Sequence, residues 1–375
     1  MSDWGVDGHN DWPHLIRGYY DNNLDARFVS QNDLAGHVDI KRLKEGKMGG
    51  VFWSAYVDCP EEGDFSDANH LEPLRDTLQQ IDLIHRLINI YKDDLELVDT
   101  AADVMRIFRD GRCASLIGVE GLHQIGNSAS VLRMYHRLGV RYITLAHNKN
   151  NLYADSATAV APAHDGLSSK GKEMVLEMNR IGMMIDLSHC SEAVVSDVLQ
   201  QSKAPVIFTH SSCHTLIATP RNVSDAALDN LRANNGVIMI SLIPALTASD
   251  PNTASLNDVV DHIVYVGDRI GYSHIGIGSD FDGMVKAVRG VEDISKMPSI
   301  IARMLERGIS ETNVKLVMGL NIIRVLQDVE DAARILEAQI PVLEDAVKHL
   351  WNADFRKFVE SEYPDAQKHG VKVGE

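Results

Sequence analysis

Short apolar segments alternate with longer amphipathic ones along most of this chain, and this alternation restricts the fold more than any other feature of the sequence. Segments such as 72–91 and 168–181 repeat apolar residues at intervals of three and four, as helices do. We expect strands at residues 4–10, 49–57, 114–121, 141–147, 182–189, 205–210, 236–243 and 274–283. Eight strands, most of them followed by a helix, predict a (β/α)8 barrel (TIM barrel) of the α/β class rather than a doubly wound sheet.

The domain organisation follows from the absence of breaks in this pattern. No low-complexity linker or change in composition divides the 375 residues, so we expect a single barrel domain over residues 1–375. From about residue 311 onward the sequence becomes helical, and we expect a C-terminal helical extension from about residue 326 that packs on the barrel.

Charge and cysteine content narrow the possible partners and the compartment. Acidic residues outnumber basic ones, 53 to 36, and the formal net charge is −17. Nucleic acids and anionic membranes select basic patches, so we expect neither as a partner. No apolar run approaches the roughly 18 residues that span a bilayer, and the start lacks signal-peptide regions. The cysteines (Cys59, Cys113, Cys190 and Cys213) form no CxxC pair. We therefore expect free thiols in the cytoplasm, although a removed leader would leave the same sequence.

Histidines and acids recur where the predicted strands end. They are His9, Asp11, Glu120, His147, His189, His210 and Asp280. The carboxyl ends of the strands in a (β/α)8 barrel meet at one mouth, where active sites form. Crowding so many ionisable groups costs several kcal/mol unless something compensates, and divalent metal ions do so most readily. The sequence therefore predicts a metal site at this mouth.

The types and the number of candidate ligands indicate which metal binds and how many ions the site holds. Histidines and carboxylates without a thiolate suit borderline cations such as Zn²⁺, and we expect Cys190 and Cys213 to be structural. The candidate ligands exceed what one tetrahedral ion uses, but a pair of ions roughly 3.5–4 Å apart would use them all. Glu120 is the natural bridge. One ion would take His9, Asp11 and Glu120, and the other would take Glu120, His189 and His210.

Several longer motifs follow one another in the chain: "DGHNDWP", "GGVFWSAY", "GVEGLH", "RYITLAHNKNNLYADSA", "PVIFTHSS", "RNVSD", "GIGSDFDG" and "MGLNIIRV". In this order, from residue 7 to about residue 325, they resemble the membrane dipeptidase (renal dipeptidase) family, metallopeptidases of the amidohydrolase superfamily. The resemblance implies a (β/α)8 barrel, two zinc ions bridged by a glutamate and a water or hydroxide, a dipeptide substrate and a homodimer. It extends to fungal biosynthetic relatives that remove glycine from Cys-Gly portions of glutathione adducts.

The resemblance also implies a role for each residue at a matching motif position. The metal ligands are then His9, Asp11, Glu120, His189 and His210. His147 in "LAHN" would hold the oxygen of the tetrahedral intermediate, and Arg221 in "RNVSD" would take the terminal carboxylate of the substrate. Asp280 in "SDFDG" would move the protons, from the attacking hydroxide or water to the leaving nitrogen.

Two departures from the family pattern bear on the substrate and on the compartment, respectively. The stretch "SLIPAL" (241–246) stands where the family often has asparagine and tyrosines, which predicts a more apolar pocket. The paired cysteines of secreted mammalian members have no match.

Two alternatives stay open: another binuclear-metal amidohydrolase acting on lactone, phosphotriester, N-acyl amino acid or β-lactam substrates, and a non-catalytic scaffold on the same barrel. Arg221 in its motif favours the dipeptidase.

Overall fold

Eight parallel strands close into a barrel in the computed structural model, which describes residues 5–30, 34–61, 63–363 and 365. The strands are β1 (Gly5–Asn10), β2 (Met48–Ser54), β4 (Cys113–Glu120), β5 (Val140–Thr144), β6 (Met184–Asp186), β7 (Ile207–Ser211), β8 (Val237–Ser241) and β9 (Ile275–Gly278). Each pairs in parallel with the next, β2 pairs with β4, and β9 returns to β1. The predicted (β/α)8 barrel is confirmed.

A ninth strand, β3 (Leu95–Leu97), lies outside this ring and was not predicted. It pairs with the first part of β4, where Leu95 lies opposite Cys113, while the end of β4 pairs with β5 along the same edge. Three residues in the acidic stretch "DDLELVD" are too few to show a strand period, so no pattern in the sequence indicated this strand.

Five of the predicted strands (49–57, 141–147, 182–189, 236–243 and 274–283) end two or more residues earlier in the structure, and two of them run into left-handed turns. The strand expected at 182–189 ends at Asp186, and the one expected at 274–283 ends at Gly278. Beyond these ends, His189 and Asp280 adopt positive φ angles of 65° and 61°. Few residues other than glycine adopt this left-handed conformation, and a strand cannot include it.

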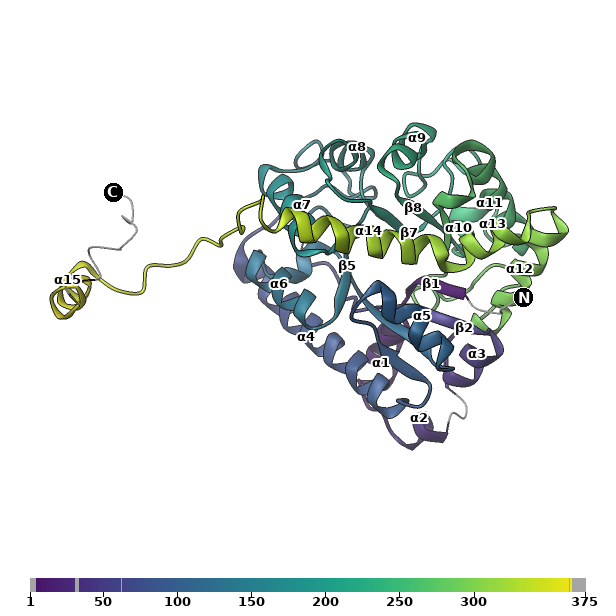
Figure 1. Cartoon of the computed structure of the whole chain (residues 1–375), viewed down its shortest axis with the longest axis horizontal. Helices are drawn as coiled ribbons and strands as arrows, with labels where there is room; N and C mark the ends of the chain where they lie inside the picture. The colour runs from purple at the N-terminus through teal and green to yellow at the C-terminus, as the bar shows by residue number, and fades with distance from the viewer. Residues whose placement is uncertain (1–4, 31–33, 62, 364, 366–375) are drawn as a thin grey trace. The chain divides into compact units, whose positions relative to one another are not determined.

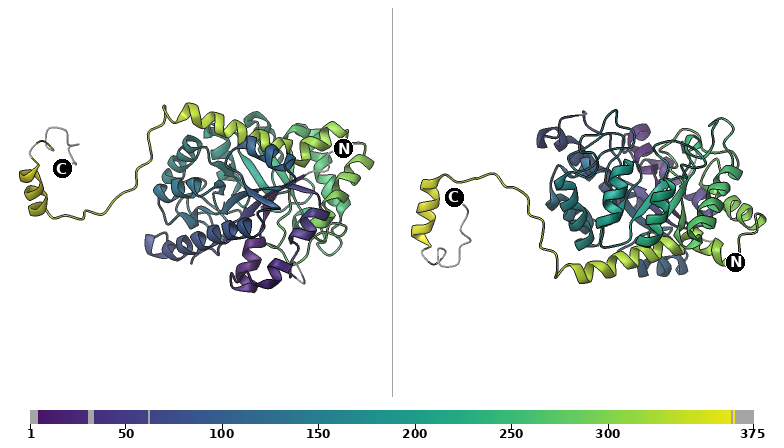
Figure 2. Two further views of the ribbon diagram at one scale, coloured as in Figure 1. Left: turned by 60° about the horizontal axis from the view of Figure 1, so that its bottom comes forward. Right: turned by 90° about the horizontal axis from the view of Figure 1, so that it is seen from above.

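Helices surround the barrel, as Figures 1 and 2 show. They are α1 (Trp12–Tyr20), α2 (Ala26–Ser30), α3 (Ile40–Glu45), α4 (Asp67–Ile90), α5 (Ala101–Arg109), α6 (Ala129–Arg137), α7 (Ser169–Ile181), α8 (Glu192–Gln201), α9 (Asp225–Asn234), α10 (Pro244–Thr247), α11 (Leu256–Ile270), α12 (Met297–Glu306), α13 (Glu311–Lys315) and α14 (Asn321–Leu336). Short turns are η1 (Leu122–Ile125), η2 (Tyr272–His274), η3 (Ile294–Lys296) and η4 (Leu316–Leu320). The helices expected at 72–91 and 168–181 correspond to α4 and α7.

Side chains of non-adjacent strands meet inside the barrel. The rings of Phe52 on β2 and Tyr142 on β5 lie 5.3 Å apart, although β4 separates these strands. Both belong to a buried apolar cluster that also contains Met239 on β8. The same cluster includes Ile322 and Val325 of α14, the helix that crosses the barrel in Figure 1. The interior is therefore packed, and active sites in such barrels form at the mouth, where the carboxyl ends of the strands meet.

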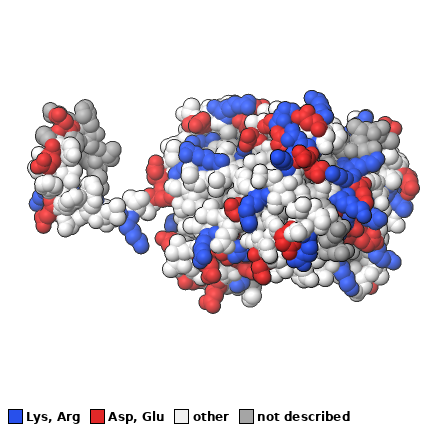
Figure 3. All heavy atoms as spheres, turned by 90° about the horizontal axis from the view of Figure 1, so that it is seen from below, with Lys and Arg blue, Asp and Glu red and all other residues white. Residues whose placement is uncertain are grey.

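The chain divides into two units near its C-terminus. Residues 1–343 form one compact unit, in which α14 packs against α5 and α7, and residues 344–375 form a second unit. The second unit contains α15 (Ala353–Glu362), a helix with no buried side chain. Among the described residues, no helix is both long and apolar enough to cross a membrane. On the face of the larger unit in Figure 3, acidic and basic side chains are interspersed.

Candidate metal centre and substrate cavity

The ends of the strands and the loops that follow them bring the predicted residues to the mouth of the barrel. His9, Glu120 and His210 lie on the strands β1, β4 and β7 themselves. Asp11 precedes α1, and His147, His189 and Asp280 follow β5, β6 and β9. Arg221 lies in the loop between β7 and α9. All eight side chains belong to one cluster and the cavity above it.

Glu120 lies at the centre of the cluster. Its Oε1 atom is 3.1 Å from Nε2 of His189, 3.3 Å from Nε2 of His210 and 3.7 Å from Nε2 of His9. Its Oε2 atom is 3.8 Å from Nε2 of His147. One buried carboxylate thus faces four imidazoles, an arrangement that suits a group shared between two cations.

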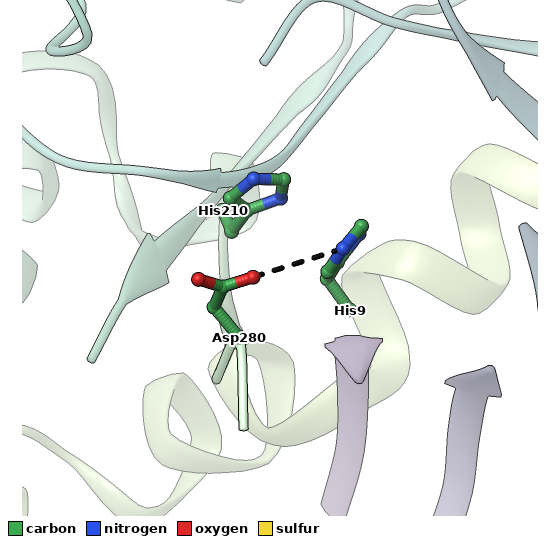
Figure 4. Close-up of side chains that lie close together, drawn as sticks. All are labelled: His9, His210 and Asp280. Atoms are coloured by element: carbon green, nitrogen blue, oxygen red, sulfur yellow. Dashed lines mark ion pairs between the residues drawn. The ribbon is translucent and has the colours of Figure 1, made fainter. Parts of the chain in front are cut away.

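Two further carboxylates lie beside His9. Nε2 of His9 is 3.3 Å from Oδ2 of Asp11 and 3.8 Å from Oδ1 of Asp280. Figure 4 shows Asp280 and His9 pointing toward one another, with His210 above them. Asp7, on the same strand as His9, is not part of the cluster, because its carboxylate accepts hydrogen bonds from N and Oγ of Ser279. That contact ties the loop of Asp280 to β1.

The cluster fits divalent metal ions. Nε2 of His9 and Oδ1 of Asp11 are buried without a hydrogen-bond partner, and buried polar atoms rarely lack one. Nε2 of His189 lies 2.9 Å from Nε2 of His210, so two ring nitrogens face the same point. Nitrogen and carboxylate donors in this arrangement are typical ligands of Zn²⁺ and related cations.

Several sets of donor atoms among the described residues are close enough to share an ion. One is His9 with Asp11 and Glu120, as predicted; others are Glu120 with His147 and His189, and His9 with His210 and Asp280. The predicted second set of Glu120, His189 and His210 is also close, at the distances given above. The ligands of each individual ion therefore stay a prediction.

A second layer of polar groups orients the ligand rings. Nδ1 of His9 lies 2.7 Å from the hydroxyl of Tyr142, and Nδ1 of His210 lies 2.8 Å from Oγ1 of Thr209. Thr209 in turn donates to the carboxylate of Asp186, at 2.7 Å. Asp186 thus supports His210 through Thr209. These contacts leave Nε2 of each ring facing the cluster.

We expect Tyr142→Phe to weaken metal binding about 10-fold to 100-fold, because losing a group that orients a ligand histidine typically has this effect. Competition with a chelator measures the affinity. Tyr135→Phe is a matched control, since the hydroxyl of Tyr135 is also buried but donates to the carbonyl of Gln124, away from the cluster. Equal affinities in the two variants would contradict the role of Tyr142.

Burial and neighbouring charges together shift the pKa values of the side chains in the cluster. It lowers the pKa of His189 and of His210 well below the ordinary value, which keeps both rings in the neutral form that binds metal. Burial also opposes the charged form of His9, but Glu120 and Asp11 outweigh it and raise the pKa of His9 to about 10. Burial, reinforced by the neighbouring Asp11, raises the pKa of Asp280 to about 8. The carboxylates therefore repel one another, and cations would relieve this repulsion.

A cavity of about 430 Å³ opens above the cluster. Its lining residues are Asp11, His14, Tyr56, Asp58, Glu120, His147, Asn148, His189, Arg221, Ile243, Leu246, Asp280 and Gly283. Both Nη atoms of Arg221 are buried and have no hydrogen-bond partner. Ile243 and Leu246 come from the "SLIPAL" stretch and add the apolar wall expected there. The cavity thus combines an unpaired cation, an apolar wall and the metal-ligand cluster.

Sequence reasoning missed part of this wall. His14, which is not among the predicted site residues, lines the cavity from α1. Tyr56 and Asp58 follow β2 and are joined by a hydrogen bond of 3.0 Å from the Tyr56 hydroxyl to Oδ1 of Asp58. Asn148 follows His147 in the sequence, and its Oδ1 atom lies 3.2 Å from Nδ1 of His189. Tyr56, Asp58 and Asn148 follow strand ends, and this position is the feature of the sequence that could have identified them as cavity residues.

Comparison with known proteins identifies the family of this chain. The sequence model of the membrane dipeptidase family (peptidase family M19) matches residues 4–340. The chain is 59% identical to dipeptidase tcpJ of Claviceps purpurea, over 96% of this chain and 85% of the relative. It is 50% identical to dipeptidase verJ of Clonostachys rogersoniana, over 94% of this chain and 91% of the relative.

Solved structures agree in fold. The crystal structure of dipeptidase AC, a metallopeptidase of family M19, is 26% identical and has a TM-score of 0.78, covering 88% of this chain and 99% of the other. A metallopeptidase from Rhodobacter sphaeroides, which carries a phosphinate mimic of the dipeptide L-Ala-D-Ala, is also 26% identical, with a TM-score of 0.77 and coverage of 88% and 100%. The chain therefore belongs to the membrane dipeptidase family, peptidase family M19, and is a hydrolase that acts on dipeptides.

Proposed function

We propose that this dipeptidase uses two zinc ions that share Glu120. His9 and Asp11 would complete the site of one ion, and His189 and His210 that of the other. When bound, such ions act as Lewis acids toward a carbonyl oxygen and lower the pKa of a water molecule toward neutrality. The unpartnered Nε2 of His9 and Oδ1 of Asp11 support this assignment, because a cation would satisfy both.

The observation that carries the choice of substrate is the guanidinium of Arg221. It is buried in the cavity, and its Nη atoms have no hydrogen-bond partner. An uncompensated buried charge is costly, so a site that keeps one is suited to an anionic ligand. A carboxylate can accept two parallel hydrogen bonds from a guanidinium, and the C-terminal carboxylate of a dipeptide would do so.

The chain also supplies groups for the reacting atoms. Nε2 of His147 faces the cluster from the cavity wall, 3.8 Å from Oε2 of Glu120, and can donate to the carbonyl oxygen as negative charge develops there. Asp280 lines the same cavity and is the proposed group that takes a proton from the attacking water and passes it to the leaving nitrogen.

Within the dipeptides, we propose Cys-Gly or a glutathione-derived conjugate as the preferred substrate class. The apolar wall of Ile243 and Leu246 supports this choice, because a thioether substituent on the cysteine side chain would bury apolar area against it. We further propose a homodimer, which light scattering tests. The four free cysteines support a reducing compartment such as the cytoplasm.

A substrate panel tests these choices on the zinc-loaded protein. It contains L-Cys-Gly, S-alkyl L-Cys-Gly, L-Ala-L-Ala, L-Ala-D-Ala, a tripeptide, a lactone and an N-acetyl amino acid. Cleavage of dipeptides alone, fastest for the S-alkyl compound, is the expected result. Turnover of the lactone or the N-acetyl compound without dipeptide cleavage would instead favour another amidohydrolase activity.

Removing the substrate's C-terminal charge gives a sharper prediction. We expect kcat/KM for the dipeptide amide L-Ala-L-Ala-NH2 to be at least about 100-fold below that for L-Ala-L-Ala, because a charge-assisted hydrogen bond is worth about 1.5–3 kcal/mol and Arg221 would stay unpaired. Initial rates of both compounds under identical metal loading measure the ratio. Equal rates would contradict the carboxylate contact.

A further inference from the structure

The thiol of Cys59 lies beside the ring proposed to stabilise the reacting oxygen. Cys59 follows β2, and its Sγ atom is 3.7 Å from Nδ1 of His147. We propose that Cys59 is a positioning residue for the reaction: it donates its S–H proton to Nδ1 of His147 and thereby keeps the N–H of that ring on Nε2, facing the substrate. This inference rests on the proposed role of His147.

The chemistry of a neutral imidazole makes this contact consequential. One ring nitrogen carries the proton and the other accepts, so a donor at Nδ1 places the N–H on Nε2. Burial lowers the pKa of His147 well below its ordinary value, which keeps the ring neutral. Burial raises the pKa of Cys59 to about 11, so the thiol keeps its proton. In the opposite tautomer, a lone pair on Nε2 would face the carbonyl oxygen and repel it.

The surrounding contacts hold Cys59 in place. Nζ of Lys149 donates to the carbonyl oxygen of Pro60 at 3.0 Å and so joins the loop after β2 to the loop after β5. The ring of Tyr56 lies 4.6 Å from that of His147, centroid to centroid. Both loops are therefore tied together on either side of the sulfur.

A second histidine competes for the thiol proton. Nδ1 of His123 is 3.9 Å from Sγ of Cys59, slightly farther than Nδ1 of His147. Nε2 of His123 is 3.0 Å from the carbonyl oxygen of Val57, which can only accept, so the proton of that ring is on Nε2. The thiol can donate to one ring at a time, and Nδ1 of His147 is the nearer of the two acceptors; among the described residues, the thiol is also the only hydrogen-bond contact found for the ring of His147.

Three substitutions at Cys59 test the inference on the zinc-loaded enzyme. Cys59→Ala and Cys59→Val both lack a donor but differ in volume, so a folded variant is available if one of them misfolds. We expect each to lower kcat about 10-fold to 100-fold with KM and zinc content unchanged, as for other groups that orient an active-site histidine. Cys59→Ser keeps a donor and is expected to stay within about 5-fold of the wild type. Cys113→Ala, a buried free cysteine at the start of β4, is the matched control and should keep the wild-type kcat.

A double-mutant cycle with His147→Gln separates positioning from packing. If Cys59 acts through His147, Cys59→Ala lowers kcat in the wild type but not in the His147→Gln background. Equal losses in both backgrounds, or a wild-type kcat in Cys59→Ala and Cys59→Val, would overturn the inference while leaving the role of His147 intact. An unchanged kcat in His147→Gln alone would overturn the role of His147, and the inference with it.

Discussion

Glu120→Gln is expected to lower kcat/KM for dipeptides by more than about 1,000-fold, which corresponds to about 4 kcal/mol of lost transition-state stabilisation. Its carboxylate lies within 3.7 Å of three ring nitrogens, those of His9, His189 and His210. Glutamine matches its shape but removes the negative charge and turns one oxygen into a donor. Both proposed metal sites would then lose their shared ligand at once, which no other single substitution in the proposed ligand set would do.

Metal content and kinetics together check this prediction. We expect bound zinc to fall in Glu120→Gln, whereas its circular dichroism should match that of the wild type because the side-chain volume is kept. Glu330→Gln is the matched control, since this half-buried carboxylate on α14 accepts a hydrogen bond from the backbone of Ala101, far from the mouth. A Glu120→Gln variant with wild-type zinc content and rate would contradict a shared metal ligand.

Arg221→Ala is expected to raise KM for L-Ala-L-Ala by about 100-fold or more, with a smaller effect on kcat, because it removes the proposed partner of the substrate carboxylate. Arg221→Lys should recover only part of this loss, since an ammonium group cannot form two parallel hydrogen bonds with a carboxylate. Folding should not suffer: the wild-type guanidinium is buried without a partner, so its removal takes away an unfavourable term.

The dipeptide amide provides the internal control for Arg221. If the guanidinium binds the carboxylate, Arg221→Ala should lower kcat/KM for the free dipeptide but hardly change it for L-Ala-L-Ala-NH2. Steady-state kinetics with four combinations of enzyme and substrate give the coupling directly. Equal losses for both substrates would show that Arg221 acts by shaping the cavity, and an unchanged KM for the free dipeptide would remove it from the site.

The sequence predicted the barrel because its pattern is repeated. Each strand and helix gives a modest signal, but eight alternating strands leave few other folds. β3 was missed because three residues cannot show a period. The strand ends at Asp186 and Gly278 were placed too late, because the left-handed turns at His189 and Asp280 depend on the loops packed around them.

The candidate site was predicted in its centre and missed at its edges. Acids and histidines at strand ends stand out because a buried charge is unfavourable unless it is paired or binds a metal ion. Tyr142 did not, because a tyrosine inside a strand is more often a core residue, and only the structure places its hydroxyl 2.7 Å from Nδ1 of His9. Cys59 and His147 are 88 positions apart, and their contact depends on two loops that no local pattern brings together.

The central claim is that the buried cluster around Glu120 holds two metal ions that dipeptide hydrolysis requires. Titrating chelator-treated protein with Zn²⁺ while following L-Ala-L-Ala hydrolysis tests it most directly. We predict no hydrolysis without metal and a rise in rate that levels off at two bound ions per chain. Full activity in the metal-free protein, or a plateau reached with no zinc bound, would contradict the claim.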